Sequence, residues 1–140
     1  MAEVVIRSEA QGLVQHIETG GHAFTSDEPV SAGGTDRGPS PYELLLAALG
    51  TCTAMTLRMY ASRKGWPLHG VTVRLSHSKI HAKDCAEFET REGRIDQIEC
   101  GLELTGDLDD VQRTRLLDIA NKCPVHRTLK AEVHVRTSLV

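Results

Sequence analysis

Two cysteines that lie far apart in the sequence have surroundings suited to thiol chemistry. Cys52 lies within a long apolar segment that begins at Pro41. Cys123 lies in the sequence Ala-Asn-Lys-Cys-Pro-Val-His, where one predicted helix ends and another begins. A thiolate is a nucleophile, and a sulfenic acid formed on one sulfur can condense with a second thiol to a disulfide. If the fold brings these two cysteines together, they form a two-thiol redox centre.

The residues after Cys123 can stabilise its thiolate. Pro124 is favoured as the first residue of an α-helix, so a short helix through residues 125–130 would leave Cys123 at its N-cap. Free N–H groups and the positive end of a helix dipole stabilise an anion there, and His126 and Arg127 are close in the sequence. We therefore expect Cys123 to ionise readily and to be a good leaving or resolving thiol.

Cys52 receives less help from its own segment. It lies in the middle of a predicted helix, in apolar surroundings that disfavour a thiolate. A cation must come from elsewhere, and the candidates are Arg37 in the preceding loop and Arg7 on the first predicted strand. Gly50 predicts close packing beside the thiol, which would leave a small reaction pocket.

Each cysteine also has a simpler interpretation, because free cysteine is often buried as a small apolar residue. Cys100, on the predicted inward face of a strand, is assigned to that role. Cys85, in a charged loop, is left as an exposed thiol without an assigned role. A soft metal is the other alternative, at one of two residue groups: Cys52, Cys123 and His126, or His77, His81 and Cys85. Neither group has a CxxC spacing or a helical pair of histidines, so we expect no metal and no cofactor.

The composition excludes several classes of protein. At 140 residues, with 40% hydrophobic and 25% charged residues, the chain is predicted to form one domain over residues 1–140. Its net charge of −3 and its lack of a basic patch argue against nucleic-acid binding. No apolar run approaches the ~18 residues of a membrane span, and no signal peptide is evident, so we expect no membrane partner. Scattered cysteines without an export signal indicate the cytoplasm.

The periodicity of apolar residues predicts the elements that position the two thiols. Short strands near residues 4–6 and 13–14 precede a hairpin turn at Gly20-Gly21 and a loop over residues 31–40. Ser40 is expected to cap a helix over residues 41–64. The apolar residues 44–49 predict burial of this helix on all sides.

The second half of the chain predicts the remaining elements. Alternation indicates a strand over residues 68–81 and a second one around residues 98–104, and a helix follows Gly106-Asp107 and runs to Lys122. A last strand is predicted over residues 133–139. The predicted order is strands, the long helix, strands, a helix and a last strand. Such segregation of strands and helices along the chain indicates an α+β protein.

Two motifs together carry a resemblance to a known family. They are Ser-Pro-Tyr-Glu-Leu-Leu-Leu-Ala-Ala-Leu-Gly-Thr-Cys-Thr-Ala-Met, from Ser40, and Ala-Asn-Lys-Cys-Pro-Val-His, from Ala120. The chain resembles the OsmC/Ohr family (osmotically inducible protein C and organic hydroperoxide resistance protein), in particular its YhfA-like branch. The resemblance implies an OsmC-like α+β fold, with two antiparallel-rich sheets wrapped around two long central helices. It also implies an intertwined homodimer with active sites at the dimer interface.

The resemblance implies thiol-dependent reduction of organic hydroperoxides or hydrogen peroxide. Cys52 would be the peroxidatic cysteine and Cys123 the resolving one. Cys52 would attack the peroxide and become a sulfenic acid, Cys123 would condense with it, and an external dithiol such as a lipoylated protein would reduce the disulfide. Disulfide closure requires the two Cα atoms to lie within roughly 7 Å.

One departure from the family pattern concerns the glutamate of a Pro-Glu pair ten residues before the peroxidatic cysteine. In the family this glutamate pairs with an arginine that orients the thiolate; here the position is Tyr42, and the acid follows at Glu43. Around the axis of a helix, Tyr42 lies about −80° from Cys52 and Glu43 about 180° from it, so the two positions are not equivalent and Glu43 faces away from Cys52. Either residue is roughly 14–15 Å from Cys52 along the axis. If either residue serves an active site, we expect that site to be built with the partner subunit. Arg37, which adjoins the helix start, is preferred over Arg7 as the family arginine.

The departure at Tyr42 leaves a second function open. The chain would then be an OsmC-related binding protein with a pocket for a small apolar or thiol ligand at the dimer interface, and with little or no peroxidase turnover.

Overall fold

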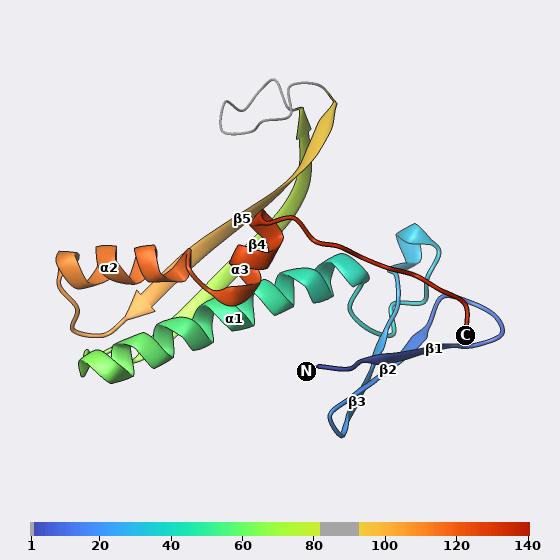
Figure 1. Cartoon of the computed structure of the whole chain (residues 1–140), viewed down its shortest axis with the longest axis horizontal. Helices are drawn as coiled ribbons and strands as arrows, with labels where there is room; N and C mark the ends of the chain where they lie inside the picture. The colour runs from blue at the N-terminus through green and yellow to red at the C-terminus, as the bar shows by residue number, and fades with distance from the viewer. Residues whose placement is uncertain (1, 82–92) are drawn as a thin grey trace. The chain divides into compact units, whose positions relative to one another are not determined.

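The computed structural model describes residues 2–81 and 93–140, so Cys85 lies outside the described residues. Figure 1 shows the whole chain, which divides into two compact units, Met1–Leu45 and Leu46–Val140. Antiparallel strands and helices are segregated along the chain, which confirms the predicted α+β class. The single domain over residues 1–140 stays a prediction.

The first unit contains a three-stranded antiparallel sheet. Its strands β1 (Val5–Ser8), β2 (Gln15–Thr19) and β3 (His22–Ser26) follow one another in the sheet as they do in the sequence. Gly20 and Gly21 join β2 to β3 with φ values of 53° and 82°, a region that glycine adopts without strain. The predicted hairpin is therefore confirmed. The loop that follows includes one short 3-10 helix, η1 (Val30–Ala32).

Asp27 organises the loop that leads to the long helix. Its side chain is 2% exposed, and its carboxylate accepts hydrogen bonds from the hydroxyl of Thr35 at 2.7 Å and from the backbone N–H groups of Glu28, Thr35 and Arg37 at 2.8, 3.1 and 3.1 Å. These bonds, that of the Thr35 hydroxyl first, lower the pKa of Asp27 from 3.8 to about 2. A Cβ atom at Gly34 would collide with the carbonyl group of Glu28, so only glycine fits there.

The long helix α1 (Pro41–Lys64) has the predicted bounds. The hydroxyl oxygen of Ser40 accepts from the N–H of Glu43 at 3.3 Å, and the carboxylate of Glu43 accepts from the N–H of Ser40 at 3.1 Å. This reciprocal pair is a capping box, and it confirms Ser40 as the N-cap. The helix ends before Gly65, which has a φ of 68°.

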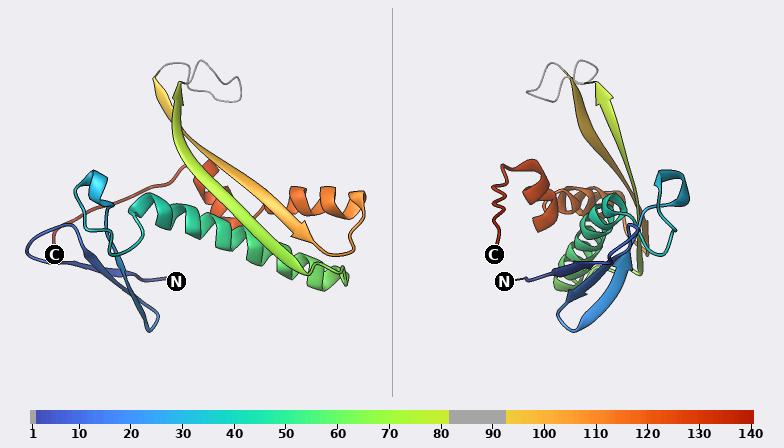
Figure 2. Two further views of the ribbon diagram at one scale, coloured as in Figure 1. Left: turned by 180° about the vertical axis from the view of Figure 1, so that it is seen from behind. Right: turned by 90° about the vertical axis from the view of Figure 1, so that its right-hand side faces the viewer.

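The second unit contains a long hairpin and three helical segments. Strands β4 (Gly70–His81) and β5 (Arg94–Thr105) form a two-stranded antiparallel sheet. The part of α1 that belongs to this unit, α2 (Asp110–Ala120) and α3 (Pro124–Lys130) all lie on one face of this hairpin (Figures 1 and 2). These segments enclose the core of the unit.

The core lies where α1, α2 and the loops between the elements meet. Its buried residues are Leu57, Ala61, Leu68, Leu108, Leu116, Ile119 and Ala120. Nearer the start of α1, a Cβ atom at Gly50 would lie 2.7 Å from Cδ1 of Leu75 on β4. The absence of a side chain at Gly50 therefore lets α1 approach the sheet closely, in agreement with the close packing predicted at this residue.

The predicted last strand is not formed. Residues 132–140 have neither helical nor strand structure, and their side chains are exposed. A strand exists only through hydrogen bonds to a neighbouring strand. Among the described residues, β4 and β5 pair with each other and the other sheet holds β1 to β3, so this segment has no strand partner within the chain.

The prediction that α1 is buried on all sides is also wrong for the single chain. Leu45 is 36% exposed, Met55 64% and Met59 67%, whereas Leu57 is completely buried. By length and composition alone, α1 is the one described helix that could cross a membrane. A core helix of a soluble protein passes the same test, so this property is weak support for a membrane span.

Candidate redox site

Cys123 is completely buried and caps the start of α3. Its backbone is extended, Pro124 is the first helical residue, and Sγ accepts a hydrogen bond from the N–H of His126 at 3.3 Å. The predicted N-cap position of Cys123 is thereby confirmed. The sulfur thus takes the place of the side-chain oxygen that caps the start of most helices.

The sulfur of Cys123 lies against α1 at Thr53. The hydroxyl oxygen of Thr53 is 3.7 Å from Sγ, and the Thr53 side chain is only 2% exposed. The same hydroxyl donates to the carbonyl of Leu49 at 2.9 Å. Because its one hydrogen is used there, a lone pair of the oxygen is available to the S–H of Cys123. Rotation of the hydroxyl would instead present its hydrogen to a thiolate.

Cys52 immediately precedes Thr53 on α1 and is half-buried. Consecutive residues of an α-helix are 100° apart around the axis, so Cys52 leaves the helix on the flank of the face that meets Cys123. The structure therefore brings Cys123 from a distant part of the sequence to the turn of α1 that carries Cys52.

A cleft of about 530 Å³ opens beside this contact. It lies between α1, β5, α2 and α3, and most of its lining side chains are apolar. The lining residues are Leu49, Thr53, Asp96, Gln97, Ile98, Cys100, Leu102, Leu117, Ala120, Asn121, His126, Leu129 and Lys130. Pockets of this size and character hold small organic molecules.

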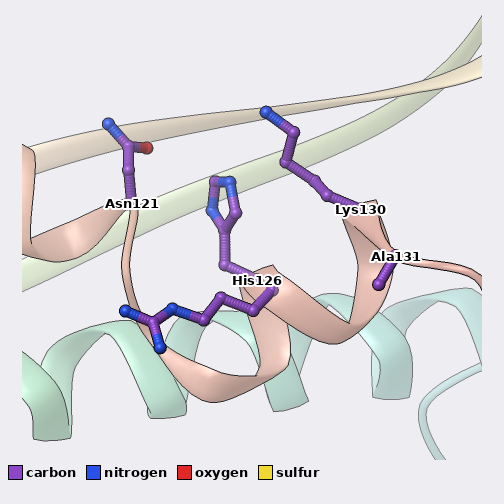
Figure 3. A pocket seen from close by; sticks show the side chains of 5 residues that line it. Asn121, His126, Lys130 and Ala131 are labelled. Carbon is purple, nitrogen blue, oxygen red and sulfur yellow. The ribbon is translucent and has the colours of Figure 1, made fainter.

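A second hollow of about 510 Å³ adjoins the cleft and carries positive charge. Arg127 and Lys130 line it, together with Asn121, His126 and Ala131. Figure 3 shows the imidazole of His126 between the side chains of Asn121 and Lys130. Burial, and to a smaller extent the charge of Lys130, lowers the pKa of His126, so its ring is neutral at pH 7.

Cys100 differs from its predicted role as a buried apolar residue. It is exposed, and it lines the same cleft as Thr53. Partial burial, followed by the charge of Cys123, raises the pKa of its thiol above 9.0. The alternation along β5 predicted its face correctly, but the helices that cover this face leave Cys100 at the open cleft.

The other candidate residues lie at the start of the chain and of α1. The guanidinium of Arg7 is paired with Glu18 at 2.6 Å on the first sheet, and the backbone of Arg37 donates to Asp27. Tyr42, 51% exposed, and Glu43 lie in the first turn of α1, where Glu43 belongs to the capping box. The backbone N–H and then the hydroxyl of Ser40 lower the pKa of Glu43. Residues 37, 42 and 43 belong to the first unit and Cys52 to the second.

The alternative of a metal site gains no support from the described residues. Within residues 2–81 and 93–140, no three side chains of histidine, cysteine, aspartate or glutamate gather in the manner of metal ligands. His77 instead contacts Asp96, with 2.8 Å between Nε2 and Oδ1.

Comparison with known proteins identifies the family. The family model described as OsmC-like protein matches residues 34–138, which include both cysteines of the predicted pair. The chain belongs to the OsmC-like family. The YhfA-like branch stays a prediction. A search of the curated proteins found no match.

Solved structures share the OsmC-like fold. An OsmC-like protein from Mycoplasma pneumoniae has a TM-score of 0.73 at 17% identity, over 93% of this chain and 87% of that one. An organic hydroperoxide resistance protein OsmC from Legionella pneumophila has a TM-score of 0.68 at 20% identity, over 93% and 89%. For the organic hydroperoxide resistance protein OhrB of Bacillus subtilis the values are 0.63 and 21%, over 93% and 90%. The predicted OsmC-like fold is confirmed.

The sequence did not single out Thr53 and Cys100 as residues of the candidate site. Thr53 continues the apolar positions Leu49 and Leu57 at intervals of four, so a polar residue on the buried face of α1 was the available signal. For Cys100 no such signal exists, because the strand pattern alone cannot show where the helical cover ends.

Proposed function

We propose that this OsmC-like protein is a thiol peroxidase that reduces organic hydroperoxides or hydrogen peroxide, with Cys52 as peroxidatic and Cys123 as resolving cysteine. The observation that carries the proposal is the contact of the Cys123 sulfur with Thr53, 3.7 Å from its hydroxyl oxygen. This contact seats the second thiol beside the residue that follows Cys52. Family membership supports it, since relatives of the same fold are named as hydroperoxide resistance proteins.

The reaction divides the reduction of the peroxide into two sulfur steps. The Cys52 thiolate attacks one oxygen of the peroxide, the O–O bond breaks, and the other oxygen leaves as an alcohol or water after protonation. Cys52 is then a sulfenic acid. The Cys123 thiolate attacks this sulfur, forms the disulfide and releases hydroxide, which is protonated to water. An external dithiol, such as that of a lipoylated protein, then reduces the disulfide in two thiol–disulfide exchange steps and is itself oxidised to a disulfide.

The apolar cleft beside this site suits the organic part of a hydroperoxide. Leu49, Leu102 and Leu117 belong to three different elements that face it. Burial of a hydrocarbon chain there would contribute about 0.8 kcal/mol per CH₂ group. The proposal therefore favours organic hydroperoxides over hydrogen peroxide as substrates.

The proposal extends to a cytoplasmic homodimer. The face of α1 that bears Met55 and Met59 is exposed, and residues 132–140 alternate in polarity without a strand partner among the residues that the structure describes. A second copy would cover such a helix face and pair with such a segment. Within this dimer, Arg37, or else Arg7, would supply the cation for Cys52. Tyr42 and Glu43 would serve a site shared with the partner subunit.

A second function, the binding of a small apolar or thiol ligand without turnover, is favoured by Tyr42. This residue occupies the position of the family glutamate, and the cleft of about 530 Å³ would accept such a ligand without redox chemistry.

Loss of cumene hydroperoxide in the presence of a dithiol separates the two functions. The wild type is expected to consume the peroxide, Cys52→Ser to be inactive, and Cys123→Ser to accumulate the sulfenic acid of Cys52. Mass spectrometry of the oxidised wild type should locate a Cys52–Cys123 disulfide. No peroxide loss in the fully reduced wild type would favour the binding function, and full activity in Cys52→Ser would remove Cys52 as nucleophile.

A further pair of variants tests the departure at Tyr42. Tyr42→Phe keeps the ring and removes the hydroxyl, and Glu43→Gln keeps the shape and removes the charge. If turnover depends on either polar group, the corresponding variant loses activity. Unchanged turnover in Tyr42→Phe would exclude the hydroxyl from the mechanism.

A further inference from the structure

We propose that Cys100 is a third redox thiol of this site, which takes over the disulfide from Cys52 by attacking the sulfur of Cys123. The product is a Cys100–Cys123 disulfide at the cleft and a free Cys52 thiolate. The inference deepens the proposed peroxidase function and rests on it for the origin of the first disulfide. The juxtaposition of Cys100 and Cys123 themselves does not depend on that function.

The three thiols differ in access to solvent in a way that suits a relay. Cys123 is completely buried, Cys52 is half-buried, and Cys100 is exposed. A protein dithiol cannot reach the buried sulfur of Cys123 from solution. Transfer of the disulfide to Cys100 would bring one of its sulfurs to the open cleft, where a large reductant has access.

The lining of the cleft places Cys100 close to Cys123. Thr53, Asn121 and His126 line it together with Cys100. The hydroxyl of Thr53 and the N–H of His126 contact the Cys123 sulfur at 3.7 and 3.3 Å, and Asn121 precedes Cys123 by two residues. The sulfur of Cys123 therefore lies immediately behind two lining residues of the cleft, Thr53 and His126, and Cys100 lines the same cleft.

The strand register gives the same placement independently. Cys100 on β5 is directly opposite Leu75 on β4. Leu75 packs on Gly50, where an added Cβ would lie 2.7 Å from its Cδ1, and Gly50 lies one helical turn before Thr53. Cys100 is thus held over the turn of α1 that contacts Cys123. The rise in the pKa of Cys100 caused by Cys123, after that caused by burial, agrees with this proximity.

The exchange is balanced and needs no additional oxidant. The Cys100 thiolate forms a bond to the sulfur of Cys123, the bond between Cys123 and Cys52 breaks, and its electron pair leaves on Cys52. The proton lost by Cys100 goes to solvent. One disulfide is consumed and one is formed, so the oxidation state of the protein is unchanged while Cys52 is restored for another peroxide. The external dithiol then reduces the Cys100–Cys123 bridge.

The acidity of Cys100 predicts a pH dependence for this step. Because its pKa is raised above 9.0, little of the attacking thiolate exists at neutral pH, and the fraction grows as the pH rises. The exchange should therefore accelerate from pH 7 to pH 9, by about tenfold for each pH unit below the pKa.

The first experiment tests the pair without peroxide. Cys52→Ser is oxidised with diamide at pH 8.5, free thiols are trapped with N-ethylmaleimide, and peptides are mapped by mass spectrometry without reduction. A Cys100–Cys123 bridge is expected. Cys52→Ser combined with Cys100→Ala is the control, and Cys52→Ser with Cys85→Ser excludes pairing through the remaining thiol. Absence of the bridge would overturn the proposal, whatever the fate of the peroxidase function.

The second experiment follows the relay itself in the wild type. After one equivalent of cumene hydroperoxide, a Cys52–Cys123 bridge should form first and a Cys100–Cys123 bridge should replace it. In Cys100→Ser the first bridge should persist, and steady-state turnover with a protein dithiol should fall by about tenfold. Cys85→Ser is the matched control and should keep wild-type turnover. Equal turnover in Cys100→Ser and the wild type would disprove the relay and leave the peroxidase function intact.

Discussion

The hydroxyl oxygen of Thr53 lies 3.7 Å from the sulfur of Cys123, although the two residues are 70 positions apart in the sequence. Both side chains are almost wholly shielded from water, so the Thr53 hydroxyl and the sulfur meet in a buried contact. The contact joins the middle of the long helix to the N-terminus of a seven-residue helix. The meeting of Cys52 and Cys123 themselves stays a prediction.

Removal of the Thr53 hydroxyl is predicted to slow closure of the disulfide. When Cys123 ionises, this hydroxyl can turn its hydrogen from the carbonyl of Leu49 to the thiolate, and a bond to a charged group is worth about 1.5–3 kcal/mol. Thr53→Val should therefore slow formation of the Cys52–Cys123 bridge by about tenfold or more. Rapid quenching and mass spectrometry measure the rate.

Thr51→Val is the matched control for this prediction. The hydroxyl of Thr51 donates to the carbonyl of Ala47 at 2.8 Å, so the variant makes the same chemical change one residue before Cys52. Equal effects of the two variants would show that the Thr53 contact has no specific role.

The close approach of α1 to β4 is predicted to depend on Gly50. Gly50→Ala would improve helix propensity by about 1 kcal/mol, but the new methyl group would overlap Leu75, at a cost of about 1–3 kcal/mol. A net loss of about 1 kcal/mol in the free energy of unfolding is expected, measured in urea. Leu75→Val shortens the opposing side chain, and the double variant should recover the loss. If it does not, the overlap is not the cause.

The carboxylate of Asp27 is predicted to make stability depend on acid pH. Its pKa is 3.8 in the unfolded chain and about 2 in the fold, so between these values the unfolded state binds the extra proton. Its contribution to stability is complete above pH 3.8 and lost as the pH falls through about 2. The stability difference between the wild type and Asp27→Asn should therefore shrink over this range.

Thr35→Val tests the cause assigned to this shift. The Thr35 hydroxyl is the largest contribution to the low pKa of Asp27, so its removal should raise that pKa toward 3.8. NMR titration of the Asp27 carboxyl carbon measures the change. A pKa that stays near 2 would assign the shift to the backbone N–H groups instead.

His126 is predicted to become protonated at a lower pH than an exposed histidine, because its pKa is lowered. Burial is the main cause of its lowered pKa and Lys130 the second. Because the unfolded state binds the proton first, the contribution of His126 to stability is complete above pH 6.5 and falls as the pH drops through the lower folded pKa. Lys130→Gln should raise the pKa of His126 part of the way to 6.5, as followed by NMR. Lys64→Gln, on α1, should leave it unchanged.

The sequence was sufficient for elements whose signals are local. Ser40 and Gly65 bracket α1 because capping and a positive φ are properties of a few neighbouring residues. The position of Cys123 at the start of α3 was predictable in the same way, since Pro124 favours the first helical turn. The paired strands β4 and β5 were predictable from alternation.

The features that could not be predicted depend on contacts between distant parts of the chain. The pattern over residues 133–139 fits a strand, but a pattern supplies no neighbouring edge for hydrogen bonds. Cys100 follows the inward alternation of β5, and its exposure depends on where α2 and α3 stop covering the sheet. The contact between Thr53 and Cys123 depends on the path of the chain between α2 and α3.

The helix cap formed by Cys123 has a mechanical consequence for the oxidised protein. Its sulfur is at once a reacting atom and the acceptor that holds the N–H of His126 in the opening turn of α3. If the proposed bridge forms, its sulfur would have less electron density to offer that N–H, and the first turn of α3 would loosen. Oxidation would then reach the imidazole in the neighbouring hollow through the backbone, and amide exchange at residue 126 would report the redox state of the thiols.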